Sequence, residues 1–239
     1  MEEREAIRER YAAAAGTSVD PMMKDGGRPG CTCYDPADLE LLPVGMASMS
    51  LGCANPVALA DLREGEIVLD LGSGAGLDTL LSARRVGPSG RVYGLDMTDE
   101  MLKLARANQL AAGIDNVEFL KGFVEAVPLP EDSVDVVVSN CVINLSIDKE
   151  AVFSEIFRVL RVGGRLAIAD VVDEESLEER SRAATVTESP CLGMALTAKR
   201  YRAGLERVGF EAISIEASHT VAPGFVSAFI RASKSSAAA

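Results

Sequence analysis

Five cysteines are the residues of this chain best suited to unusual chemistry: Cys31, Cys33, Cys53, Cys141 and Cys191. An odd number of widely spaced cysteines does not match a structural disulfide framework. Several thiolates gathered at one site select a soft, thiophilic element. Zinc is the obvious competitor, but a structural zinc site needs four ligands, usually with C-x2–4-C spacing. Cys31 and Cys33 are one residue too close for that spacing, and the chain has a single histidine.

The elements that must position these thiols alternate between strand and helix patterns from residue 66 onward. Strands are expected at 66–72, 91–97, 117–122, 133–140 and 164–172, with helices between them at 77–86, 99–113 and 149–160. Alternating units of this kind predict a parallel sheet with helices on both faces. The last two strands, 211–221 and 225–233, are separated only by Ala-Pro-Gly. Because that link is too short for a parallel crossover, one of the two strands must run antiparallel.

This topology brings three cysteines toward one edge of the sheet. Cys141 directly follows the strand at 133–140, at the carboxyl edge where open α/β sheets bind ligands. Cys191 lies in the long connection after the strand at 164–172, which emerges at the same edge. Cys53 precedes the first strand, in a segment able to fold over that edge. Taken singly, each is as well explained as a small buried hydrophobe; together they predict a thiolate site.

A glycine loop follows the first strand and predicts a cofactor site at the same edge. The loop reads DLGSGAG over residues 70–76, and Asp96 ends the next strand about twenty residues later. Glycines let the backbone approach a ligand closely, and a carboxylate at the second strand end can accept both ribose hydroxyls. The spacing departs from the G-x-G-x-x-G pattern that receives a pyrophosphate. Asp70 would repel a pyrophosphate and suits a cationic ligand such as S-adenosylmethionine.

The motifs VLDLGSGAG and VYGLDM resemble those of class I S-adenosylmethionine-dependent methyltransferases. The resemblance implies an α/β, Rossmann-like sheet of seven strands in the order 3-2-1-4-5-7-6, with the last strand antiparallel and helices on both sides. It also implies that the loop after the third strand reads the adenine, although Phe123 is as well explained by core packing. The residues expected to bind the cofactor are Asp70, Gly72, Ser73, Gly74, Gly76, Asp96, Met97, Phe123, Val124, Glu125 and Asn140.

The methyl acceptor is expected to need no general base. The one histidine, His219, falls inside a predicted strand, where a structural role is the better explanation. A trivalent metalloid needs only three thiolates and keeps a lone pair, which is itself a nucleophile toward a sulfonium methyl. Three clustered cysteines and the absence of a candidate base therefore favour a metalloid acceptor.

Five motifs, VLDLGSGAG among them, are similar to those of the arsenite methyltransferases; the others are LGCANP, GLDMTDEM, SNCVINLS and FRVLRVGGRLAIAD. The resemblance implies that Cys141 and Cys191 hold As(III), and that Cys53 contacts arsenic and later forms a disulfide. Its partner would be Cys31 or Cys33, and the sequence offers both. Tyr11 matches an aromatic position near the cofactor in relatives.

The implied reaction is methyl transfer to As(III), presented as a thiol conjugate, with release of S-adenosylhomocysteine. Thioredoxin or a small thiol such as glutathione would then restore the enzyme. Two alternatives remain open: a methyltransferase of a small organic acceptor, and a metalloid sensor without turnover.

Composition limits the partners of the chain. Its 239 residues include 24 basic and 36 acidic side chains, a formal net charge of −12, which argues against binding to nucleic acid or to an anionic membrane surface. No apolar run of membrane-spanning length and no signal peptide are present, so the cytoplasm is expected.

Residues 1–60 are expected to form an N-terminal extension, helical over 1–15 and a loop over 16–30. Residues 61–235 would form the methyltransferase domain, with helices at 173–184 and 197–209 and an arsenic-binding connection at 173–196.

Overall fold

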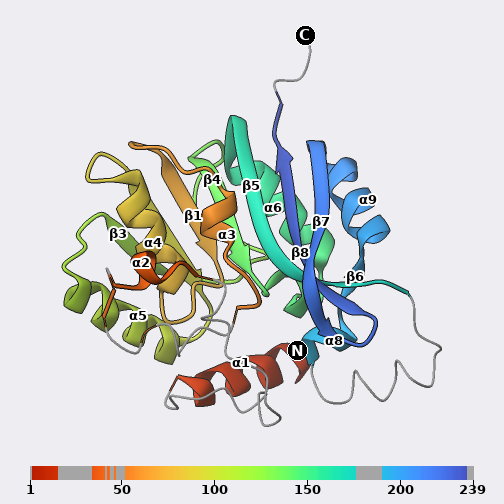
Figure 1. The fold of residues 1–239 in the computed structure, drawn as a ribbon, viewed down its shortest axis with the longest axis horizontal. Helices are drawn as coiled ribbons and strands as arrows, with labels where there is room; N and C mark the ends of the chain where they lie inside the picture. Colours follow the sequence, from red (N-terminus) through yellow and green to blue (C-terminus); the bar gives the residue numbers. More distant parts are fainter. Residues whose placement is uncertain are drawn as a thin grey trace.

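The computed structural model describes residues 2–15, 34–40, 42–43, 46, 52–175 and 190–235. In this part of the chain, eight strands form one sheet in the order β3-β2-β1-β4-β5-β8-β7, and β6 pairs with β5 beside that path (Figure 1). Neighbouring strands from β3 to β5 are parallel, and β8 is antiparallel to both β5 and β7. The strands are β1 (Ile67–Leu71), β2 (Arg91–Asp96), β3 (Val117–Lys121), β4 (Val134–Asn140), β5 (Leu160–Asp173), β6 (Leu196–Thr197), β7 (Glu211–Ala222) and β8 (Phe225–Ser233).

The sheet predicted from the sequence is confirmed. Setting aside the two-residue β6, which the sequence pattern did not predict, the strand order is 3-2-1-4-5-7-6 with the last strand antiparallel. The β7–β8 connection is a tight turn in which Gly224 has φ 74°, a conformation that glycine adopts without strain. β5 is longer than predicted, and its carboxyl half pairs with β8 through to Phe225. The β7–β8 hairpin therefore reaches the carboxyl edge of the sheet.

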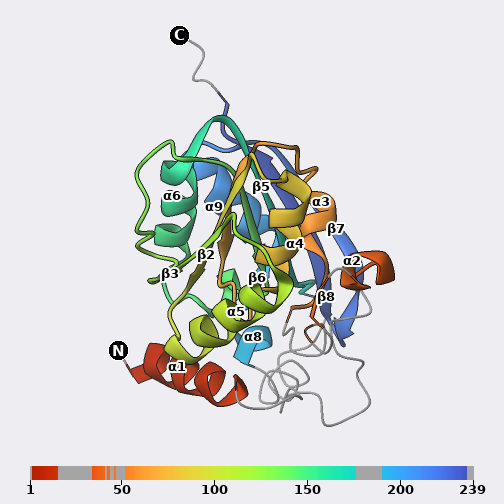
Figure 2. The same ribbon diagram turned by 90° about the vertical axis from the view of Figure 1, so that its left-hand side faces the viewer.

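Helices cover both faces because the residues of each strand alternate between two cores. Val68 and Val136 pack with α3, α4 and α5, whereas their neighbours Leu69 and Val137 pack with α6 and α9. Figures 1 and 2 show the two helical layers on either side of the sheet. The helices are α1 (Glu2–Ala14), α2 (Pro36–Glu40), α3 (Pro56–Leu59), α4 (Leu77–Val86), α5 (Asp99–Ala112), the 3-10 helix η3 (Ile143–Leu145), α6 (Lys149–Val159), α8 (Pro190–Gly193) and α9 (Ala198–Val208).

Local contacts set two of the helix ends. Asp148 caps α6 by accepting the Ala151 backbone N–H at 3.0 Å, and the α5 helix ends at Gly113 in the left-handed conformation. The helix predicted at 173–184 falls mainly on residues outside the described ranges. The loop predicted at 16–30 and the cysteines Cys31 and Cys33 also lie outside them.

The segment before β1 packs onto the sheet at two places. Figure 1 shows α1 lying across the carboxyl ends of the strands, next to α5. Tyr34, Met46 and Val57 are buried in the same core as α4. None of the helices within the described ranges is both long and apolar enough to cross a membrane.

Candidate functional site

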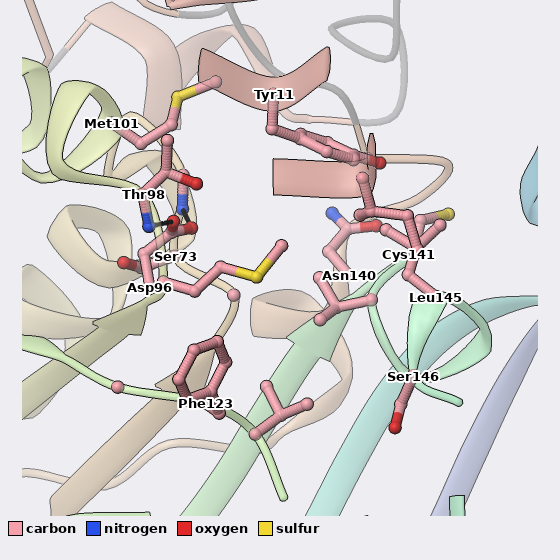
Figure 3. Close-up of a pocket in the computed structure, with 18 of the residues that line it drawn as sticks. Tyr11, Ser73, Asp96, Thr98, Met101, Phe123, Asn140, Cys141, Leu145 and Ser146 are labelled. Carbon is pink, nitrogen blue, oxygen red and sulfur yellow. Dashed lines mark hydrogen bonds between the residues drawn. The ribbon is translucent and has the colours of Figure 1, made fainter. Parts of the chain in front are cut away.

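A pocket opens at the carboxyl edge of the sheet, between the ends of β1, β2 and β4 and beneath α1. Figure 3 shows Asp96, Thr98 and Met101 on one side of it, Asn140, Cys141 and Leu145 on the other, and Tyr11 of α1 near its mouth. Its lining is made of Ile7, Tyr11, Gly52, Gly72, Ser73, Gly74, Ala75, Leu77, Asp78, Asp96, Met97, Thr98, Met101, Gly122, Phe123, Val124, Glu125, Asn140, Cys141, Val142, Leu145, Ser146 and Ile147.

The glycine loop forms one wall of the pocket. Gly72, Gly74 and Gly76 all have positive φ angles, of 71°, 50° and 90°. A Cβ on Gly72 would lie 2.4 Å from a methyl group of Val142, the residue after Cys141. Only glycine lets the loop pass this close to the segment that carries the thiol. Ser73 contributes a buried hydroxyl that has no hydrogen-bond partner in the part of the chain the structure describes.

Asp96 lies at the end of β2 and faces the glycine loop. One carboxylate oxygen accepts the Gly74 N–H at 2.9 Å and the other accepts the Thr98 N–H at 2.8 Å. Burial raises the pKa of Asp96, and these backbone hydrogen bonds lower it. Each oxygen can accept a further hydrogen bond. The carboxylate is therefore fixed in place and still able to receive hydroxyl groups of a ligand.

The pocket lining fits a ligand that carries positive charge and no phosphate. Its described residues include the carboxylates Asp78, Asp96 and Glu125 and no lysine or arginine. Phe123 is 42 % exposed, an unusual exposure for a large apolar ring, and it lies beside Val124 at the pocket floor. An apolar surface beside a carboxylate that can accept hydroxyl groups is suited to a flat heterocycle. S-adenosylmethionine has these features, whereas a dinucleotide would bring its phosphates against the carboxylates.

Asp70 occupies a different place from the one expected for a ligand contact. Its side chain is buried behind the loop and outside the pocket lining, where one carboxylate oxygen accepts the Thr79 hydroxyl at 2.6 Å. Burial and the nearby charge of Asp78 raise the pKa of Asp70 well above its usual range. This geometry gives Asp70 a role in holding the first turn of α4 beneath the glycine loop.

Two of the predicted thiols meet at the rim of the pocket. Cys53 and Cys141 are joined as a disulfide, with their Cα atoms 6.1 Å apart. Cys141 itself lines the pocket. The resemblance implied Cys31 or Cys33 as the later disulfide partner of Cys53; both lie outside the described residues, so that pairing stays a prediction. The segment containing Cys53 is fastened to the end of β4, which brings its sulfur to Cys141.

Asn140, the last residue of β4, holds the Cys53 segment against the strand by hydrogen bonds. Its side-chain oxygen accepts the Cys53 N–H at 3.0 Å, and its amide nitrogen donates to the Ala54 carbonyl at 2.7 Å. A Cβ on Gly52 would lie 2.2 Å from the same amide nitrogen, so the approach requires glycine. Asn140 was predicted to bind the cofactor. It does line the pocket, but its described hydrogen bonds hold the thiol-bearing segment.

Asp78 and Tyr34 extend this network. The Tyr34 hydroxyl donates to Asp78 at 2.8 Å, and the Asn140 amide nitrogen lies 3.0 Å from both the Tyr34 oxygen and the second Asp78 oxygen. The pKa of Asp78 is raised to about 6, because burial raises it by more than the hydrogen bonds from Asn140 and Tyr34 lower it. Tyr34 follows Cys33 directly, so its buried ring anchors the chain next to the predicted N-terminal thiols.

The third predicted thiol, Cys191, lies on α8, and its side chain is outside the described part of the structure. Its neighbour Leu192 packs in one cluster with Val171, Phe225, Cys53 and Cys141. The backbone that carries Cys191 therefore runs beside the other two thiols. Among the described side chains, no group of three or more His, Cys, Asp or Glu residues is arranged to hold a metal ion.

Sequence reasoning missed several contributors to this site. Ser227 of β8 is fully buried, and its hydroxyl lies 3.5 Å from the Cys53 sulfur. Tyr34 and Asp78 were not singled out either. The strand pattern of 225–233 shows that Ser227 and Phe225 face the same side, but no local signal indicates that this side meets Cys53.

Comparisons with known proteins agree with this geometry. Residues 62–217 match the family model described as "Methyltransferase domain". An arsenite methyltransferase of Halobacterium salinarum is 41 % identical over 230 residues, which are 90 % of this chain and 59 % of that protein. A human arsenite methyltransferase is 38 % identical over 152 residues, which are 60 % of this chain and 40 % of that protein.

A solved structure adds to this likeness. The crystal structure of CrArsM, an arsenic (III) S-adenosylmethionine methyltransferase from Chlamydomonas reinhardtii, is 31 % identical with a TM-score of 0.71. The match covers 89 % of this chain and 76 % of that one. The chain spans less than two thirds of the length of both arsenite methyltransferase sequences named above.

Proposed function

Since the chain belongs to the arsenite methyltransferase family of class I methyltransferases, we propose that it transfers a methyl group from S-adenosylmethionine to thiol-bound As(III). The observation that carries this proposal is the position of Cys141. Its side chain lines the pocket opposite the glycine loop, and its sulfur is bonded to that of Cys53. Two thiols at the rim of a pocket for a cationic cofactor are suited to hold a soft acceptor atom beside the methyl donor.

The pocket residues divide the work of holding the cofactor. Asp96 would accept the ribose hydroxyls, and Phe123 with Val124 would contact the adenine. The backbone of Gly72 and Gly74, the Ser73 hydroxyl, Met97 and Glu125 would contact the remainder of the cofactor. Gly76, also predicted to bind the cofactor, precedes α4 and lies outside the described lining, where a Cβ would be 2.9 Å from the Phe119 ring. When bound, S-adenosylmethionine supplies an electrophilic methyl group on a sulfonium. The absence of a described cation in the lining supports this ligand.

The substrate As(III) would arrive as a thiol conjugate and be bound by the thiolates of Cys53, Cys141 and Cys191. Bound in this way, arsenic keeps a lone pair that attacks the methyl carbon, so no side chain has to remove a proton. The thiolates contribute chiefly by proximity, holding arsenic roughly 3 to 3.5 Å from the methyl carbon. S-adenosylhomocysteine is the product left in the pocket.

Redox chemistry must accompany each turnover. The Cys53–Cys141 disulfide has to accept two electrons before both sulfurs can bind arsenic. Methyl transfer uses the arsenic lone pair and leaves the arsenic pentavalent. Two thiols that become a disulfide supply the two electrons that return it to the trivalent state, with Cys31 or Cys33 available as a second partner for Cys53. Thioredoxin or a small thiol such as glutathione would then reduce the disulfide.

We also infer the organisation and setting of the chain. Residues 1–60 would form an extension that carries Cys31, Cys33 and Cys53, and residues 61–235 the methyltransferase domain with the arsenic-binding connection at 173–196. A reaction that consumes thiols fits the cytoplasm, where thiols are kept reduced. Removal of inorganic arsenic by methylation would serve detoxification or biotransformation.

The test is arsenic speciation after incubation of the protein with S-adenosylmethionine, arsenite and a reducing thiol. We expect methylated arsenic from the wild type and a loss of at least about 100-fold with Cys141→Ser, since one ligand of the acceptor is removed. Binding of S-adenosylhomocysteine to Cys141→Ser, measured by calorimetry, is the control and should stay within about twofold.

Two outcomes would contradict the proposal. Full methylation by Cys141→Ser would show that the thiol does not hold the acceptor. Stoichiometric As(III) binding by the wild type without any methylated product would identify a sensor instead.

A further inference from the structure

Asp170 is a fully buried carboxylate directly beneath the thiol site, and the proposed reaction makes no use of it. It lies near the carboxyl end of β5, next to Ala169, whose carbonyl accepts the Cys141 N–H at 2.8 Å. One Asp170 oxygen accepts the Val171 N–H at 2.8 Å and the Asn144 amide at 2.9 Å. The other accepts the Asn144 N–H at 3.1 Å and the Tyr201 hydroxyl at 3.1 Å.

A carboxylate in this position is costly to the fold. The pKa of Asp170 is raised to about 6, because burial raises it by more than the hydrogen bonds from Val171, Asn144 and Tyr201 lower it. Burial and the charge of Asp170 raise the pKa of Tyr201 well above its usual range. An apolar side chain of similar size would avoid this cost. The hydrogen-bond partners of the carboxylate come from η3, β5 and α9, so the carboxylate joins these three elements.

Asn144 carries the connection further. Its amide nitrogen also donates to the Val171 carbonyl at 2.6 Å, and its side-chain oxygen accepts the Leu196 N–H at 3.2 Å. Asn144 is fully buried. It follows Cys141 by three residues, and Leu196 follows Cys191 by five. A single side chain thus joins the segment after one thiol to the segment after the other.

Tyr201 joins the same carboxylate from the helix that follows Cys191. Its hydroxyl bonds Asp170, and its ring packs against Phe153 of α6 with the ring centroids 5.5 Å apart. α8, which carries Cys191, contacts both η3 and β5. The side chains of Asp170 and Asn144 supply hydrogen bonds that join the Cys141 segment to the Cys191 segment. Backbone pairing of β5 with Cys141 and with β6, and apolar packing around Leu192, join the same segments.

We propose that Asp170 and Asn144 are positioning residues that set the separation between the Cys141 and Cys191 thiols. This proposal rests on the proposed function, in which both thiols bind one arsenic atom. Two sulfurs can share an atom only within a narrow range of separations, and an error of about 1 Å in a reactive geometry costs on the order of 100-fold. The buried carboxylate keeps the two segments in fixed register while the thiols are exchanged between free, arsenic-bound and disulfide forms.

The test compares arsenic and cofactor binding in Asp170→Asn. In this variant an NH2 group replaces one carboxylate oxygen of Asp170 and faces the donors that oxygen accepted. At least one of the four hydrogen bonds to residue 170 is therefore lost. The sulfur ligands of bound arsenite are counted by X-ray absorption in proteins that also carry Cys31→Ser and Cys33→Ser. We expect three sulfurs in the parent and fewer in Asp170→Asn, with As(III) affinity weakened at least tenfold and S-adenosylhomocysteine affinity within twofold.

The outcomes separate this proposal from the proposed function. A parent protein that binds no As(III) through thiols would contradict the proposed function itself. A parent with three sulfurs and an Asp170→Asn variant with the same three, at the same affinity, would overturn only the positioning role. Equal losses of arsenic and S-adenosylhomocysteine binding would assign Asp170 to general stability and would also overturn it.

A milder substitution keeps the proposal testable if Asp170→Asn does not fold. Tyr201→Phe removes one hydrogen bond to Asp170 and retains the packing against Phe153. In turnover assays we expect the KM for arsenite to rise at least threefold while the KM for S-adenosylmethionine is unchanged. A Tyr201→Phe enzyme with both constants unchanged, or with both raised alike, would refute the positioning role.

Discussion

Replacing Asn140 by alanine should loosen the pairing of Cys53 with Cys141. The Asn140 side chain makes two short hydrogen bonds to the segment that carries Cys53, one from the Cys53 N–H and one to the Ala54 carbonyl, and the Ala54 N–H is 3.5 Å away. At a net value of about 1 kcal/mol each, their loss costs about 2 kcal/mol of docking free energy. With tenfold for each 1.4 kcal/mol, the equilibrium constant for forming the disulfide should fall roughly 30-fold.

The assay is equilibration in glutathione redox buffers, with the oxidised fraction read by mass spectrometry after alkylation of free thiols. Cys31, Cys33 and Cys191 are replaced by serine so that only one pair can form. Asn116→Ala is the matched control, because the Asn116 amide also bridges chain segments, donating to the Ala83 and Gly87 carbonyls at 3.1 and 2.8 Å, but at the opposite edge of the sheet.

We expect the control to leave the disulfide equilibrium unchanged within about twofold. An unchanged equilibrium in Asn140→Ala, or an equal shift in both variants, would refute the idea that Asn140 delivers Cys53 to Cys141.

Three further predictions follow from individual contacts. Asp96→Ala should weaken S-adenosylhomocysteine binding by roughly 10- to 100-fold, because hydrogen bonds to a charged group are lost; an unchanged Kd by calorimetry would contradict the ribose-binding role. The pKa of Asp78 is raised from 3.8 to about 6, so its favourable contribution to stability is complete below about pH 3.8 and is lost as the pH rises through 6. Asp78→Asn should therefore lose less unfolding free energy than the wild type between pH 4 and 6, by a difference of roughly 3 kcal/mol at most in urea titrations. The same dependence of unfolding free energy on pH in both proteins would contradict the raised pKa of Asp78. Gly94→Ala would place a Cβ 2.6 Å from the Phe119 ring and should destabilise the fold by about 1–3 kcal/mol; wild-type stability would show that the ring can move aside.

Much of the pocket lining could be predicted from the sequence because its residues follow strands at short, fixed distances. Parallel strands present their carboxyl ends at one edge, so the glycine loop, Asp96 and Cys141 had to gather there whatever the details of packing. The tight link between the last two strands likewise required an antiparallel pair. Asp70 is the exception within this set. Its place in the loop predicted a ligand contact, whereas its side chain accepts the Thr79 hydroxyl and lies outside the pocket lining.

The thiol site could be predicted only in part. The pattern located Cys53, Cys141 and Cys191 in three segments that reach the same edge, but it did not indicate that Cys53 and Cys141 would be bonded to each other. Ser227, which contacts the Cys53 sulfur, is 174 residues away along the chain. No periodicity or spacing connects residues so far apart, because their contact depends on how the β7–β8 hairpin and the segment before β1 pack together.

By itself the sequence determined the sheet, its one antiparallel strand and the edge at which a cationic cofactor and a set of thiols come together. These features depend on hydrophobic alternation, on glycine conformation and on the length of connections, all of which are local properties. Tertiary structure alone decided which sulfurs touch and what holds them in register. Asn140 bonds a segment 87 residues before it, and Asp170 receives donors from three elements, since side-chain hydrogen bonds form only after packing has brought their partners within about 3 Å.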